Sequence, residues 1–197
     1  MGVHVALLRG INVGGHNKLP MKDLASMFRE AGCGEVRTYI QSGNVVFAAD
    51  DALAARIPGI ITGSIREHFG FEVPLIMRSA GQLSDIVRAN PFATEAADER
   101  ELSVAFLADA PEESALEALD PQRSPPDELV VDGSQIYLRF PDGVARSKLT
   151  NAYFDATLRT TSTVRNWRTT KRLLQLAESL SADAIRKSLD GLLNEAS

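Results

Sequence analysis

The sequence contains one cysteine, Cys33, which excludes an internal disulfide and any metal site built from several cysteines. Its three histidines show no metal-ligand spacing, and no apolar run approaches the roughly 20 residues of a membrane-spanning helix. The N-terminal segment lacks a basic stretch followed by the apolar core of a signal peptide. We therefore expect a cytoplasmic protein with no metal site and no membrane contact.

A net positive charge is also lacking, since the formal charge is −5, and this disfavours wrapping of nucleic acid over the whole surface. The charge is nevertheless polarised along the chain. Residues 83–120 hold ten acidic and two basic side chains, whereas residues 143–172 hold seven basic and one acidic. Because salt screens charges beyond roughly 8–10 Å, a local cationic face can hold an anion even on an acidic protein.

What is present is an ordinary globular composition, with 44% hydrophobic and 24% charged residues in 197 positions. In the first half, apolar spacing and turn residues predict a β-α-β-β-α-β order. Pro58, Gly59 and Gly63 weaken the second helix of this half. The predicted elements are a strand at Val3–Leu8, a helix opened by Pro20, strands at Val36–Ile40 and Asn44–Ala48, a helix within Asp51–Phe69 and a strand at Glu72–Arg78.

The second half repeats this order after a helix near Gln82–Ala89. Its predicted elements are a strand at Leu102–Ala108, a helix at Pro111–Leu119, strands at Glu128–Val131 and Gln135–Phe140, a helix at Thr150–Leu158, a strand at Ser162–Asn166 and a closing helical region. The fold class indicated is α+β, with two tandem ferredoxin-like (βαββαβ) units, antiparallel sheets and C-terminal helices. The expected domains are a first unit at 1–79, a helical linker at 80–101, a second unit at 102–167 and a helical region at 168–197.

This topology brings the glycine-rich segment 10–18 beside the hairpin turn 41–44, at one edge of the first sheet. Glycines allow backbone N–H groups to approach an anion, and a helix follows with its positive end. The alternative is that the glycines only satisfy turn geometry. The candidate ligand-binding residues here are Arg9, Asn12, Gly14, Gly15, Asn17, Lys18, Gln41, Ser42 and Asn44.

A second polar edge collects the segments that follow the third and fourth strands of the second unit. Arginine side chains suit phosphate or carboxylate groups. The candidate ligand-binding residues at this edge are Arg146, Ser147, Lys148, Arg165, Asn166 and Arg168. Trp167 has two interpretations, a stacking surface for a ring or a core residue under the last helix, and we favour the core.

Two segments, Leu7–Gly15 with Asn17-Lys18 and Thr38–Phe47, closely resemble a known family. Three later segments also resemble landmarks of that family: Asn90-Pro91-Phe92, Arg146–Leu149 and Arg165-Asn166-Trp167. The family is domain of unknown function 1697. The resemblance implies a mostly bacterial, cytosolic α+β protein with two ferredoxin-like halves, and it brings no assigned activity.

The residues favour a binding module for a phosphate-bearing small molecule or nucleic-acid segment. One alternative is an enzyme, a transferase or hydrolase acting on such a ligand, and another is an interaction module that forms a homodimer. No carboxylate pair, nucleophile elbow or activated thiol identifies a reaction. Catalytic residues and cofactors are therefore left unassigned.

Overall fold

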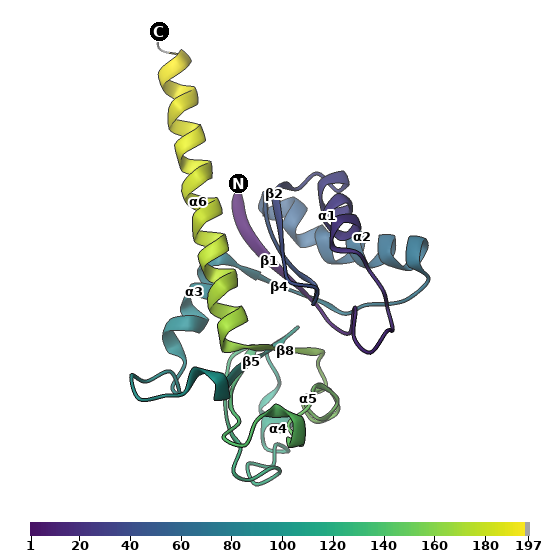
Figure 1. Cartoon of the computed structure of the whole chain (residues 1–197), viewed down its shortest axis with the longest axis vertical. Helices are drawn as coiled ribbons and strands as arrows, with labels where there is room; N and C mark the ends of the chain where they lie inside the picture. Colours follow the sequence, from purple (N-terminus) through teal and green to yellow (C-terminus); the bar gives the residue numbers. More distant parts are fainter. Residues whose placement is uncertain (196–197) are drawn as a thin grey trace. The chain divides into compact units, whose positions relative to one another are not determined.

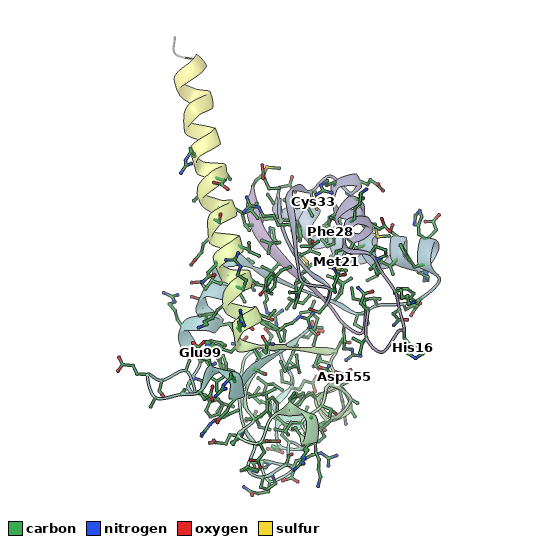
Figure 2. All side chains as sticks on the ribbon, viewed as in Figure 1. His16, Met21, Phe28, Cys33, Glu99 and Asp155 are labelled. Carbon is green, nitrogen blue, oxygen red and sulfur yellow. The ribbon has the colours of Figure 1, made fainter. Side chains whose placement is uncertain are left out.

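The computed structural model describes the backbone of residues 1–195 and the side chains of residues 1–184 and 186 (Figure 1; Figure 2). The chain forms two compact units, each described here by itself. Unit 1 comprises Met1–Gln82 and Leu173–Ser197, and unit 2 comprises Leu83–Arg172. The fold is mixed α/β, with two four-stranded antiparallel sheets and, over the described residues, six α-helices.

Unit 1 is built on a sheet with the strand order β2-β3-β1-β4. Its elements are β1 (Gly2–Leu8), α1 (Met21–Glu30), β2 (Gly34–Tyr39), β3 (Asn44–Ala49), α2 (Asp51–Phe69) and β4 (Leu75–Ser79). Figure 1 shows α1 and α2 on one side of this sheet. The core lies between the two layers, where the rings of Phe28 from α1 and Phe47 from β3 are 4.9 Å apart.

Local sequence signals explain how α2 begins and ends. Asp50 caps the helix, since its side chain accepts a hydrogen bond from Leu53 N at 2.7 Å, and Gly70 ends it with a φ of 75°. Pro58 lies inside the helix without interrupting it. The apolar stripe Ala54, Ile57, Ile61 and Ile65 is buried at helical spacing, and this packing offsets the hydrogen bond that proline cannot donate.

Unit 2 has a sheet with the strand order β6-β7-β5-β8, which matches the order in unit 1. Its strands are β5 (Leu102–Leu107), β6 (Glu128–Asp132), β7 (Gln135–Arg139) and β8 (Ser162–Asn166). Its helices are α4 (Glu113–Leu116) and α5 (Asn151–Leu158), with 3₁₀ turns η1 (Glu99–Glu101) and η2 (Val144–Arg146). Two helices, α3 (Ala80–Ala89) and α6 (Trp167–Glu195), contribute residues to both units.

Both faces of each sheet are covered by the protein. In unit 2 the helices α4 and α5 cover one face, where Phe154 and Leu138 are fully buried. On the opposite face Tyr137 is also buried, and its hydroxyl donates to Ile86 O in α3 at 3.1 Å. Burial on two faces explains why the central strands β1, β3 and β5 are nearly continuous apolar runs, whereas burial alternates along the edge strands β4 and β6.

Two helices differ from their predicted lengths. The helix expected at Pro111–Leu119 is a single turn, Glu113–Leu116, because Pro111 and the polar segment beyond Leu119 leave only Ala115 buried in it. The closing region forms one continuous helix, Trp167–Glu195. The expected domain boundaries at residues 79, 101 and 167 stay a prediction. No helix among the described residues is both long and apolar enough to cross a membrane.

Candidate functional site

Asn12 connects the glycine-rich loop to the first hairpin turn in unit 1. Its Nδ2 donates to Leu19 O at 2.8 Å and to Gln41 O at 2.9 Å. Its Oδ1 accepts from Leu19 N at 2.8 Å. The predicted proximity of the 10–18 and 41–44 segments is therefore confirmed, and the amide of Asn12 links them by a hydrogen bond.

Two other asparagines of this edge also make internal hydrogen bonds. Asn17 Nδ2 donates to Gly10 O at 3.0 Å. Asn44 is fully buried, and its Nδ2 donates to Tyr39 O at 3.1 Å and to Ser42 Oγ at 2.9 Å. These amides position the loops, so the groups that remain on the surface must supply any ligand contact.

The glycines of this edge have specific conformational roles. His16 N donates to Val13 O at 3.0 Å, and the two residues between them, Gly14 and Gly15, have φ values of 58° and 82°. A Cβ on Gly43 would lie 2.7 Å from Leu8 Cβ. Turn geometry thus requires the glycines. The side chains of His16, Lys18 and Gln41 are exposed, Arg9 is half-buried, and Figure 2 shows His16 at the outer end of the loop.

The second polar edge lies in unit 2, and the register of the strands shows which segments meet there. Arg139 at the end of β7 pairs with Leu102, and Asn166 at the end of β8 pairs with Ser103. The segments after β7 and β8 therefore leave the same end of the sheet. Glu128, the first residue of β6, also pairs with Arg139, so the loop before β6 reaches this end as well.

Arg146 and Lys148 are both exposed on the segment after β7. The backbone around them is held in place, since Lys148 N donates to Ser124 Oγ and Leu149 N donates to Ser147 Oγ, each at 3.0 Å. Ser147 is thus a turn residue. Among the described residues, no carboxylate forms an ion pair with Arg146 or Lys148.

Arg165 differs from these exposed cations, because it is 8% exposed on β8. Its Nη1 donates to Thr163 Oγ1 at 2.8 Å and to Val164 O at 3.0 Å. Burial lowers its pKa to about 10. The guanidinium is therefore buried rather than presented at the edge.

Asn166 and Arg168 lie at the start of α6. Asn166 Oδ1 accepts from Thr169 N at 2.8 Å and so caps the helix. Trp167 between them is 2% exposed, which confirms its interpretation as a core residue. Asn166 and the exposed Arg168 line a hollow of about 260 Å³ together with Glu99 and Arg100 of η1.

Sequence reasoning missed Glu99 and Arg100. Their only signal is a charged run, Asp98–Glu101, and nothing in that run indicates that it folds against the end of β8. Lys171 forms an ion pair with Glu99. Hydrogen bonds from Arg100 lower the pKa of Asp98 to about 2, so Arg100 already has an anionic partner.

Two observations concern metal binding and the reactivity of the single cysteine. Within the residues that the structure describes, no group of three histidine, cysteine or acidic side chains is placed to hold a metal ion. Burial raises the pKa of the Cys33 thiol to about 11. Its thiolate is the reactive form, so this shift disfavours nucleophilic chemistry at Cys33.

Comparison with known proteins identifies a family. The model of the family described as protein of unknown function (DUF1697) matches residues 1–137, and the chain belongs to this family. A search of curated proteins found no match. Among solved structures, the chain is similar to the conserved bacterial protein SP0830 from Streptococcus pneumoniae, with a TM-score of 0.68 and 22% sequence identity. The similarity covers 89% of this chain and 98% of that chain, and at this identity it shows the fold alone.

Proposed function

We propose that this member of the family is a binding module for a phosphate-bearing ligand, and that its principal site is the basic end of the unit 2 sheet. We further propose that the two units are duplicated ferredoxin-like units, since both sheets have the same strand order. In this proposal the site consists of Asn166 and Arg168 at the start of α6, with Arg146 and Lys148 alongside.

The observation that carries the proposal is the charge at the N-terminus of α6. The positive end of a helix dipole disfavours cations by about 0.3–1 kcal/mol each. The first six residues of α6 nevertheless include Arg168, Lys171 and Arg172 and no acidic side chain. An anion in the adjacent hollow would be stabilised both by these cations and by the helix end. Glu99 already pairs with Lys171, so Arg168 is the cation at this helix end that a ligand phosphate would balance in this proposal.

The existing ion pairs decide which cation near the hollow is available to contact a ligand. Lys171 is paired with Glu99 and Arg100 with Asp98, so both would have to leave a carboxylate to bind a ligand. Arg168 has no such pair among the described residues and lines the hollow. Arg168 is therefore the principal phosphate contact in this proposal.

Arg146 and Lys148 would provide a second contact. The ends of β7 and β8 lie on either side of β5, at two strand spacings or about 10 Å, and Arg146 and Lys148 follow seven and nine residues after the end of β7. In this proposal a ligand that contacts them as well as Arg168 has more than one phosphate, as a nucleoside triphosphate or a short nucleic-acid strand does. Exposed Lys18 and the Gly14-Gly15 turn at the unit 1 edge are a weaker anion-binding candidate, because the asparagine amides of that edge already make internal hydrogen bonds.

The proposal is tested by titrating the protein with pyrophosphate, a nucleoside triphosphate and a short oligonucleotide at low and high salt. Because a charge-assisted hydrogen bond contributes about 1.5–3 kcal/mol, Arg168→Gln should weaken binding roughly tenfold or more. The double variant Arg146→Ala/Lys148→Ala should weaken the longer ligands most. Screening and counterion release should weaken all binding as salt rises.

The matched control is Lys22→Ala/Arg29→Ala, which removes two exposed cations from α1 and should leave binding unchanged. The thermal midpoint of the Arg168→Gln variant should stay the same or rise slightly, because a cation leaves the helix N-terminus. Absence of salt-sensitive binding to the unmodified protein would contradict the proposal. Unfolding of the Arg146/Lys148 double variant would show that these residues stabilise the fold instead.

A further inference from the structure

A second hollow, of about 310 Å³, lies in unit 1 between helices α1 and α2. Its lining from α1 consists of positions spaced three and four apart, which helical geometry places on one face. The last two residues of α2, His68 and Phe69, complete it together with Ser64, which lies four positions before His68. The full lining is Asp23, Ser26, Met27, Glu30, Ser64, His68 and Phe69.

The charged groups of this hollow are all hydrogen-bond acceptors. Asp23 and Glu30 are exposed, and neither forms an ion pair with another described residue. No lysine or arginine lines the hollow. A ligand that satisfies these carboxylates must therefore donate hydrogen bonds and carry positive charge.

The imidazole of His68 presents another acceptor. Its Nδ1 lies 2.9 Å from Ser64 O, and a backbone carbonyl can only accept, so Nδ1 carries a hydrogen and donates it. In the neutral ring this leaves the lone pair on Nε2, the more distant nitrogen. His68 is exposed and lines the hollow with the two carboxylates.

The remaining lining is apolar and polarizable. Met27 is 8% exposed, and Phe69 is half-buried, with its ring 6.2 Å from that of Phe71. An aromatic face attracts a cation, and a thioether adapts to an alkyl chain. The hollow thus combines carboxylates with a surface suited to methylene groups.

We propose that this hollow binds a small organic cation, an alkyl diamine or an aminoalkyl guanidine. Asp23 and Glu30 are seven residues apart, which separates them by about 10 Å along the helix. A ligand with a cationic group at each end of a four- or five-carbon chain can contact both. The volume is near the lower limit of about 300 Å³ for small-molecule sites, which suits a ligand of this size. This inference is independent of the phosphate site in unit 2.

The test is an amide NMR titration of the full chain with 1,4-diaminobutane and agmatine, with n-butylamine and 1-butanol in parallel. We expect saturable shifts centred on Ser26, Met27, Ser64 and Phe69. The ligands with two cationic ends should bind most tightly, n-butylamine less tightly, and 1-butanol not measurably. Asp23→Asn/Glu30→Gln should weaken diamine binding by roughly tenfold or more, because two charge-assisted contacts are lost.

The matched control is Glu67→Gln, which removes an exposed carboxylate next to His68 that does not line the hollow. Equal weakening by this control would overturn the proposal, since it would indicate only general attraction to an acidic protein. Shifts of the same size with 1-butanol, or no saturable shift with either dication, would also overturn it. Tighter binding of a capped arginine peptide than of agmatine would show that the occupant is a protein side chain instead.

Discussion

Ile40 combines two unfavourable features at a single residue. Its φ of 49° is in the left-handed region, which strongly disfavours β-branched side chains, and its side chain is 51% exposed. Two asparagines hold the backbone on either side of it. Asn44 Nδ2 donates to Tyr39 O, and Asn12 Nδ2 donates to Gln41 O. The loop framework therefore imposes this conformation on Ile40.

Replacing Ile40 with asparagine should stabilise the protein. Asparagine accepts the left-handed conformation at lower cost, and little buried apolar surface is lost at this position. We expect the free energy of unfolding to rise by up to about 1 kcal/mol, measured by chemical and thermal denaturation. For a chain of this length that corresponds to about 2–4 °C in the thermal midpoint.

Val13→Asn serves as the comparison for Ile40. Val13 is 64% exposed but does not have a positive φ, so its replacement removes exposed apolar surface without relieving strain. Its thermal midpoint should not rise. If Ile40→Asn lowers the midpoint, the side chain of Ile40 stabilises the fold by more than its backbone conformation costs.

At the scale of elements, β4 and β8 carry buried arginines at equivalent positions. Arg78 pairs in register with Val5 of β1, and Arg165 pairs with Val104 of β5. Each donates through Nη1 to the carbonyl of the preceding residue. In both cases burial lowers the pKa of the guanidinium to about 10. The recurrence of this detail supports the proposed duplication more specifically than strand order does.

Arg165→Lys should destabilise unit 2 although it conserves the charge. The hydrogen bonds to Thr163 Oγ1 and Val164 O both come from Nη1, and the compact lysine ammonium is more strongly hydrated than the planar guanidinium, so it is more costly to bury at this position. We expect a loss of about 2 kcal/mol in the free energy of unfolding. The exposed Arg168→Lys is the control and should change stability by less than about 0.5 kcal/mol. Equal stability of both variants would mean that Arg165 contributes only its charge.

The order of elements was predictable because hydrophobic spacing and turn residues act locally. The proximity of Asn12 and the 41–44 turn followed from that order. What Asn12 does was not predictable, since its partners are the backbone groups of Leu19 and Gln41, which every residue type carries. Likewise, the hollow at the start of α6 depends on η1 lying beside Asn166, a long-range placement with no local signal.

At the scale of the whole molecule, α6 is one helix that contributes to both units. Its first six residues belong to unit 2 and contain the proposed phosphate contact, whereas the part from Leu173 onward belongs to unit 1. In that later part Leu173, Ala177 and Leu180 form a fully buried stripe. Arg37 of β2 forms an ion pair with Asp183 at 3.1 Å. The later turns of α6 are thus a structural part of unit 1.

A charge placed in this stripe should therefore destabilise unit 1 selectively. Ala177→Asp would bury an unpaired carboxylate, which costs several kcal/mol unless the helix moves away. In amide hydrogen exchange we expect β1, β2 and β3 to lose protection to a greater extent than β5 and β7. The neighbouring exposed variant Glu178→Gln should leave both units protected. Equal loss of protection in both sheets would instead show that the two units unfold as one cooperative structure, since local opening of a separate unit would leave the other intact.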